Sequence, residues 1–122
     1  MAKILIVEDD PFLIKMYIKK LQIEGFEVES AEDGMTGLAK IKSIRPDLVI
    51  MDVMLPKMNG IEALEKSKAD PETKNIPILV LTNLSTSQDA EIAVKKGAVG
   101  YMVKSDYTPS QVISRIKQIL KM

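Results

Sequence analysis

The sequence predicts an α/β fold in which a parallel β-sheet is covered by helices on both faces. Short apolar runs alternate five times with segments whose apolar residues recur at helical spacing. Some of these runs contain no polar residue, as is typical of strands buried on both faces. The alternation by itself leaves the order of the strands open.

The predicted strands are short runs bounded by polar residues, glycine or proline. They span residues 3–7, 26–30, 48–51, 78–81 and 99–103. The second run alternates between apolar and polar residues, which favours a place nearer the edge of the sheet.

The predicted helices begin near Pro11, Asp33, Gly60, Ser87 and Pro109. Proline suits the first turn of a helix because it has no backbone N–H to leave unpaired there. The apolar stripe of the first helix consists of Phe12, Leu13, Met16, Tyr17 and Leu21. In the second helix, the residues expected to face inward are Met35, Leu38, Ala39 and Ile41. The fourth helix, over residues 87–96, has only a weak apolar face.

Length and composition restrict the function. The 122 residues are expected to form one domain, residues 1–122. The 17 basic and 17 acidic side chains give a net charge of +0, so we expect no direct contact with nucleic acid. The absence of cysteine and histidine excludes disulfides, thiolate chemistry and histidine catalysis, and leaves oxygen ligands for any metal.

The sequence also predicts no association with a membrane. No apolar stretch approaches the ~20 residues that a transmembrane helix needs. The first predicted strand begins almost at Met1, which leaves no room for a signal peptide. We therefore expect a cytoplasmic protein.

The stretch around Asp52 organises the chain. Asp52 follows the apolar run 48–51, and Pro56 marks a point by which that strand has ended. The carboxyl ends of parallel strands form the ligand crevice of an open α/β sheet. Taken alone, Asp52 would be better explained as a residue that simply caps a turn.

Other polar side chains follow the predicted strands in the same way. These are Glu8, Asp9 and Asp10 after the first strand, Asp52 after the third, Thr82 after the fourth and Lys104 after the fifth. Each has an ordinary interpretation: the acids suit a helix N-terminus, Thr82 suits a helix cap, and lysine is usually solvated. Those interpretations together leave the shared position at strand ends unexplained.

Carboxylates gathered at one edge of a sheet need a compensating cation. Two unit charges about 4 Å apart repel by on the order of 4 kcal/mol at an effective dielectric of about 20. Asp9, Asp52, a carbonyl near Met54 and, through a water, Glu8 would supply oxygen ligands that suit Mg²⁺. Lys104 and Thr82 would stabilise phosphoryl oxygens during transfer to Asp52, which would act as a nucleophile and form an acyl phosphate.

With these residues in view, the whole chain resembles the receiver domain of bacterial two-component response regulators, of the chemotaxis-regulator type. The motifs that carry the resemblance are Ile-Leu-Ile-Val-Glu-Asp-Asp-Pro (4–11), Asp-Leu-Val-Ile-Met-Asp-Val-Met-Leu-Pro-Lys-Met-Asn-Gly (47–60), Pro-Ile-Leu-Val-Leu-Thr (77–82) and Gly-Ala-Val-Gly-Tyr-Met-Val-Lys (97–104). The resemblance implies a flavodoxin-like, doubly wound sheet of order 2-1-3-4-5 with five helices. Asp9 and Asp52 would then lie on neighbouring strands at the topological switch point.

The resemblance also implies a function. Asp52 would accept a phosphoryl group from a sensor histidine kinase or a phosphotransfer protein, with Mg²⁺ held by Asp9, Asp52, the Met54 carbonyl and, through water, Glu8. Thr82 and Lys104 would bind the phosphoryl group, and Thr82 and Tyr101 would act as the switch. The fourth helix, fifth strand and fifth helix would then control a downstream protein or a missing output domain. Such a protein catalyses only its own phosphorylation and slow autodephosphorylation.

The sequence departs from the family pattern near the site. Ser105 follows Lys104 where the family usually has a cis proline, and a non-proline cis bond costs ~2.5–4 kcal/mol, so a trans bond is predicted. Asn83 occupies a position that is usually small, which would narrow access for the phosphodonor. Met54 and Leu84 flank the site with apolar bulk, which predicts slow hydrolysis of the acyl phosphate.

Three rival functions remain. An interaction module with this fold but no phosphoryl chemistry would not need Asp9, Asp52, Thr82 and Lys104 together. A phosphatase of the haloacid dehalogenase type would have an aspartate two residues after the nucleophile, where Met54 stands. A nucleotide-binding protein would have a glycine-rich loop after the first strand, where Glu8, Asp9 and Asp10 would repel phosphate.

Overall fold

The computed structural model describes residues 2–122, which form five strands and five α-helices in strict alternation. The elements are β1 (Lys3–Val7), α1 (Pro11–Ile23), β2 (Glu27–Ala31), α2 (Gly34–Ile44), β3 (Leu48–Met51), α3 (Gly60–Ala69), β4 (Ile78–Thr82), α4 (Ser87–Lys95), β5 (Gly100–Val103) and α5 (Pro109–Ile119). A short 3₁₀ helix, η1 (Lys104–Asp106), follows β5. Each predicted helix and strand is confirmed to within two residues at the ends that the sequence specified.

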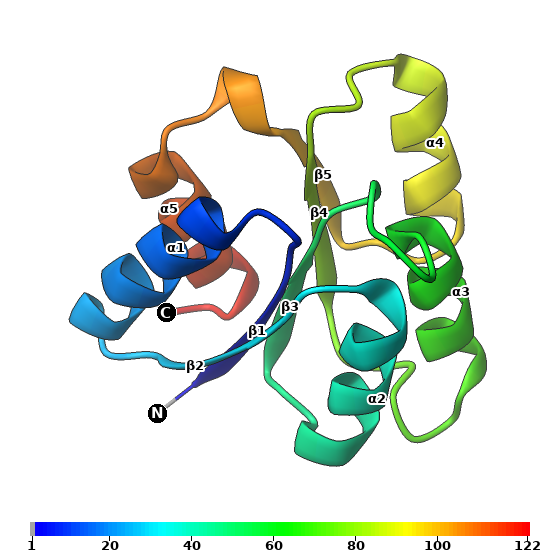
Figure 1. Ribbon diagram of the computed structural model, residues 1–122, viewed down its shortest axis with the longest axis horizontal. Helices are drawn as coiled ribbons and strands as arrows, with labels where there is room; N and C mark the ends of the chain where they lie inside the picture. Colours follow the sequence, from blue (N-terminus) through cyan, green and yellow to red (C-terminus); the bar gives the residue numbers. More distant parts are fainter. Residues whose placement is uncertain (1) are drawn as a thin grey trace.

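The five strands form one parallel sheet of order β2-β1-β3-β4-β5. This is the flavodoxin-like order that the resemblance implied. Helices cover both faces: α1 and α5 lie on one side of the sheet, and α2, α3 and α4 lie on the other (Figure 1). In Figure 1 the blue and red helices are therefore separated from the teal, green and yellow ones by the strands.

Each face of the sheet has its own hydrophobic core, because successive side chains of a strand point to opposite faces. Ile4 and Ile6 of β1 pack with α1 and α5, whereas Leu5 and Val7 pack with α2 and α3. β1, β3 and β4 are almost wholly buried, as the uninterrupted apolar runs predicted.

The helices begin where the local sequence provides caps. The Asp10 side chain accepts from the backbone N–H of Phe12, and Asp33 and Asn59 cap α2 and α3 in the same way. Thr108 and Gln111 form a reciprocal capping box at the start of α5, directly before Pro109.

Some predicted core positions are wrong. Phe12 is 74% exposed, because the face of α1 that contacts the sheet is formed by Ile14, Tyr17 and Leu21. Met35 is 55% exposed and Ala39 is also exposed, since α2 turns Gly34, Gly37 and Ile41 toward the sheet. Both errors have the same cause: an apolar residue next to the buried stripe of a helix cannot be distinguished by sequence spacing from a residue within that stripe. Among residues 2–122, the helices are too short or too polar to span a membrane.

Candidate functional site

The register of the sheet brings the predicted site residues to one edge. Val7 of β1 pairs with Met51 of β3, so the residues that follow them, Glu8 and Asp52, leave the sheet side by side. Thr82 of β4 pairs with Val103 of β5, and Lys104 comes directly after that pair. Four strand ends therefore converge, as the sequence predicted.

The two acids and the threonine of this edge are removed from solvent. Glu8 is 6% exposed, Asp52 is 7% exposed and Thr82 is fully buried. Asp9, by contrast, is exposed and lies at the mouth of the site. Buried carboxylates are costly unless they are paired, so their partners define the electrostatics of the site.

Lys104 is the partner of both buried carboxylates. Its ammonium donates to Oδ2 of Asp52 at 2.8 Å and also to Oε1 of Glu8. Burial alone would lower the pKa of the Lys104 ammonium, but the hydrogen bonds to Asp52 and Glu8 and the negative charges of these two acids together outweigh burial and raise it. Lys104 is therefore a fixed positive charge directly against Asp52.

Glu8 is held by its own backbone as well as by Lys104. Its Oε2 accepts from the backbone N–H groups of Asp9 at 3.0 Å and Asp10 at 3.1 Å. Burial raises the pKa of the Glu8 carboxyl, although the hydrogen bond from Lys104 opposes that shift. No pattern in the sequence indicated that Lys104 would bind Glu8 in addition to Asp52.

The acidic cluster fits a hard divalent cation. One carboxylate oxygen from each of Glu8, Asp9 and Asp52 lies within 4.8 Å of the other two. Lys104 offsets only part of this negative charge, and all of these donors are oxygens, which Mg²⁺ prefers. Exposure of Asp9 leaves one side of the cluster open to water, which suits an ion that keeps several waters.

Met54 also belongs to this edge. Its backbone N–H donates to Oδ1 of Asp52 at 3.3 Å, so the chain folds back over the carboxylate immediately after β3. Both oxygens of Asp52 therefore have a partner, Oδ1 on the Met54 side and Oδ2 on the Lys104 side.

The side chains of Thr82 and Tyr101 both bond to the backbone of Leu84. The sequence did not indicate this role for Leu84. Oγ1 of Thr82 accepts from the backbone N–H of Leu84 at 3.4 Å, and the Tyr101 hydroxyl donates to the Leu84 carbonyl at 2.7 Å. Within residues 2–122, no hydrogen bond joins Thr82 to Asp52 or Lys104. Leu84 makes both contacts through its backbone, which carries no signal in the sequence.

The backbone after Lys104 agrees with the presence of Ser105 where the family usually has a cis proline. Residues 2–122 contain no cis peptide bond, so the predicted trans bond between Lys104 and Ser105 is confirmed. Ser105 and Asp106 continue into the 3₁₀ helix η1, which leads to Tyr107. Tyr101, in β5, is half-buried.

Comparison with known proteins agrees with this geometry. A model of the response regulator receiver domain family matches residues 4–117. The chain is 33% identical to the DNA-binding dual master transcriptional regulator RpaA of Synechocystis sp. over 99% of its own length and 50% of that protein. It is 35% identical to the DNA-binding response regulator MtrA of Mycolicibacterium smegmatis over 98% of its length and 50% of that protein. The chain thus spans about half the length of the curated relatives it matches.

Solved structures of similar length share the fold. The chemotaxis protein CheY4 of Vibrio cholerae is 34% identical, with a TM-score of 0.89 over 97% of this chain and 98% of that chain. A CheY-like receiver domain protein of Methanospirillum hungatei is 30% identical, with a TM-score of 0.92 over 99% of this chain and 94% of that one. The chain belongs to the response regulator receiver domain family, whose members are phosphoacceptor signalling domains rather than conventional enzymes.

Proposed function

We propose that residues 1–122 act as the receiver domain of a two-component response regulator and that Asp52 is the phosphorylated residue. The observation that supports this most directly is the environment of Asp52: a buried carboxylate bonded to Lys104 within a cluster of two further acids. A buried carboxylate that is paired with a fixed cation has its negative charge balanced, which suits it to act as a nucleophile.

Mg²⁺ is the proposed cofactor. Asp9, Asp52, the Met54 carbonyl and, through a water, Glu8 would hold it, and when bound it supplies positive charge to the phosphoryl oxygens. Asp9 is suited to this role because its side chain is exposed, whereas Glu8 and Asp52 are both paired with the Lys104 ammonium.

The transfer itself uses side chains of this chain. An Asp52 carboxylate oxygen forms a bond to phosphorus, the bond from phosphorus to the donor's imidazole nitrogen breaks, and its electron pair stays on that nitrogen. Lys104, 2.8 Å from Oδ2 of Asp52, then lies close enough to pair with a phosphoryl oxygen. The Thr82 hydroxyl, at the end of the adjacent strand β4, would donate to another.

Phosphorylation would reach the surface through Leu84. A phosphoryl group adds roughly −1.5 to −2 charge and new acceptor oxygens. If Thr82 turns its hydroxyl toward them, it gives up the Leu84 N–H, and Leu84 in turn holds the Tyr101 hydroxyl. The switch residues Thr82 and Tyr101 are therefore coupled through the backbone of a single residue, Leu84, which lies between β4 and α4.

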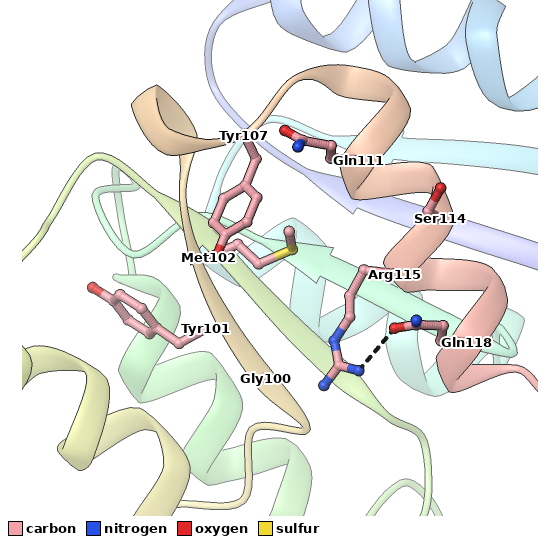
Figure 2. Close-up of a pocket in the computed structure, with 8 residues that line it drawn as sticks. All are labelled: Gly100, Tyr101, Met102, Tyr107, Gln111, Ser114, Arg115 and Gln118. Carbon is pink, nitrogen blue, oxygen red and sulfur yellow. Dashed lines mark hydrogen bonds between the residues drawn. The ribbon is translucent and has the colours of Figure 1, made fainter.

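The proposed output surface consists of α4, β5 and α5. A pocket on this surface is lined by residues of β5 and α5 and by Tyr107 (Figure 2). Figure 2 shows the Tyr101 side chain turned toward α4, away from Arg115 and Gln118, which bond to each other on the other wall. A change at Tyr101 would alter both the pocket and the packing of α4.

The partners follow from the proposed chemistry. A sensor histidine kinase or a phosphotransfer protein would supply the phosphoryl group, and we assign the protein to the cytoplasm, where the ATP that charges such a kinase is found. The curated relatives are DNA-binding regulators about twice as long, so an output domain or a separate downstream protein would receive the signal. Neither nucleic acid nor a membrane is proposed to contact residues 1–122 directly.

The test is incubation of the protein with acetyl phosphate and Mg²⁺, with the intact mass as the readout. The wild type is expected to gain the mass of one phosphoryl group, and Asp52→Asn none. Asp47→Asn is the matched control, because Asp47 precedes the same strand at its opposite end and bonds the backbone of Lys3. A wild type that stays unmodified would favour an interaction module without phosphoryl chemistry, and a modified Asp52→Asn would remove Asp52 from its assigned role.

A further inference from the structure

The loop between β3 and α3 contacts the first residue of each of two helices. A Cβ atom on Gly34, the first residue of α2, would lie 1.8 Å from the Met58 carbonyl oxygen. A Cβ atom on Gly60, the first residue of α3, would lie 1.9 Å from the Asp52 carbonyl oxygen. Both approaches are far below the 3.0 Å that real Cβ atoms keep, so the loop backbone lies where only glycine leaves room.

The α2 side of this contact has further links to the loop. The backbone N–H of Gly34 donates to the Pro56 carbonyl at 3.4 Å, and Lys57 Nζ lies 3.9 Å from Oδ2 of Asp33. Lys57 adopts a left-handed conformation with φ of 68°, which a non-glycine residue holds only when its surroundings impose it. The Met58 side chain is half-buried against the core beneath α2 and α3.

The same loop carries the groups that the proposed function needs. It begins at Asp52 and includes Met54, whose N–H donates to Oδ1 of Asp52. The Gly60 N–H donates to the Val53 carbonyl at 2.8 Å, so the start of α3 fixes one end of the loop. The other end, at residues 56–58, is held by its contact with α2, by the Met58 side chain and by a hydrogen bond of 2.7 Å from the Met58 N–H to the Pro56 carbonyl.

From these contacts we infer that Gly34 is a positioning residue for the cation site: by letting α2 approach the Met58 carbonyl, it sets where the loop holds Met54 over Asp52. This inference rests on the proposed function, because it assigns a task to the loop that would ligate Mg²⁺. Gly34 itself belongs to α2 and makes no contact with the acidic cluster. Its effect is transmitted through the backbone of residues 54–58.

A merely structural role would have a different signature. If Gly34 served only the packing of α2, a Cβ atom there would lower thermal stability without changing how Mg²⁺ binds to the folded protein. A positioning role requires that the loop become less protected and that Mg²⁺ affinity fall at temperatures where the protein remains folded.

The experiment compares Gly34→Ala with the wild type in two measurements that need no phosphodonor. Amide hydrogen exchange of residues 53–59 is measured without Mg²⁺, and Mg²⁺ affinity is measured by titration calorimetry. Gly34→Ala is expected to speed exchange in that segment and to weaken Mg²⁺ binding by about tenfold or more, as is usual when the support of a metal ligand is removed. Unchanged exchange and unchanged affinity would overturn the inference.

Gly25→Ala is the matched control. Gly25 has φ of 94°, so alanine is strained there, but nothing lies within 4 Å of the added Cβ atom. This variant is expected to lose stability while keeping wild-type Mg²⁺ affinity and wild-type exchange in residues 53–59. If Gly25→Ala reproduced both effects of Gly34→Ala, general destabilisation would account for them and the inference would be wrong.

If the Gly34→Ala protein does not fold, a second pair of variants tests the same inference. Met58→Ala loosens the loop through its side chain and leaves α2 intact. Met35→Ala instead removes an exposed methionine of α2 that lines the same surface pocket as Met58. Met58→Ala is expected to weaken Mg²⁺ binding and Met35→Ala is not; equal affinities would contradict the inference. If the wild type bound no Mg²⁺, the proposed function would be wrong. If the wild type bound Mg²⁺ and the variants bound it equally well, only the inference about Gly34 would be wrong.

Discussion

At the scale of single residues, Lys104 shows how one side chain can serve two buried acids. Its ammonium bonds both Asp52 and Glu8, and because these side chains are at most 15% exposed, water and salt screen the contacts less than they screen a surface ion pair. Because Asp9 lies outside this arrangement, the cluster retains an acid that Lys104 does not neutralise. The same residues therefore balance the Asp52 carboxylate and leave Asp9 available for the proposed cation site.

Met54 is expected to set the lifetime of the phosphorylated form. Its side chain is 63% exposed beside Asp52 and offers no hydrogen bond to a water that attacks the acyl phosphate. Met54→Asn is expected to speed hydrolysis by up to about tenfold, or about 1.4 kcal/mol of barrier. The decay of the phosphorylated mass after removal of the donor measures this, with Met35→Asn as the control. A half-life unchanged in Met54→Asn would contradict the expectation.

Asp33 gives stability a defined pH dependence. The backbone N–H of Thr36 donates to Asp33 at 2.7 Å and lowers the pKa of that carboxyl from its usual value of 3.8. A lowered pKa contributes stability above pH 3.8, and that contribution is lost as the pH falls through the folded-state value. Asn at position 33 keeps a capping acceptor but cannot titrate.

Asp33→Asn is therefore expected to melt at a lower temperature than the wild type at pH 7, and the difference should shrink at pH 3. Thermal denaturation of the two proteins at both pH values measures it. Glu32→Gln, which removes an exposed charge from the adjacent position, is the control. A difference that grows on acidification would contradict the sign.

At the scale of elements, α4 has the fewest buried residues of the five α-helices in the described part of the chain. Ala93 is its only fully buried residue within the described chain, and the neighbouring Ile92 and Val94 are exposed. The end of α4 is tied to α3, because Lys96 pairs with Glu65 and Gly97 lies against the Lys68 side chain. Its beginning follows the Leu84 backbone that Thr82 and Tyr101 both contact. Such a helix can shift at its start while its end stays fixed.

Tyr101→Phe tests that description of α4. Removing the hydroxyl deletes the hydrogen bond to the Leu84 carbonyl, worth about 0.5–1.5 kcal/mol, while the ring remains. Amide exchange across residues 84–92 is expected to become faster, with Mg²⁺ affinity unchanged. Tyr107→Phe is the control, because Tyr107 is exposed and lines the pocket beside α5. Equal exchange in both variants would show that the Tyr101 hydroxyl does not restrain α4.

At the scale of the whole molecule, the sheet joins two separate cores into one folding unit. Leu64 of α3 is fully buried on one face of the sheet, and Ile116 of α5 is fully buried on the other. The two helices α3 and α5 lie on opposite sides of the sheet (Figure 1). Both cores share β1, β3 and β4, so neither face can lose its packing without loosening the strands that carry the site.

Leu64→Ala and Ile116→Ala are each expected to lower the free energy of unfolding by about 2–5 kcal/mol. Urea denaturation should show a single transition for both variants, since the two cores unfold together. Ile23→Ala, at an exposed residue, is the control and should stay within about 0.5 kcal/mol of the wild type. Two separate transitions would contradict a single cooperative unit.

The sequence by itself determined the elements and the residues that end the strands. Apolar periodicity, proline and capping residues are local signals, and they predicted β3, its following Asp52 and the start of α5 at Pro109. The strand order came from the resemblance to receiver domains, because periodicity does not encode which strands pair.

Only the tertiary structure decided how the site residues meet. The register of β1 and β3 placed Glu8 beside Asp52, and this let Lys104 bond both acids. The backbone of Leu84 joined Thr82 to Tyr101, and the contact of Gly34 with the Met58 carbonyl depends on how closely α2 approaches the loop. These features arise between segments far apart in the chain, and some involve backbone atoms that every residue shares, so no local pattern could specify them.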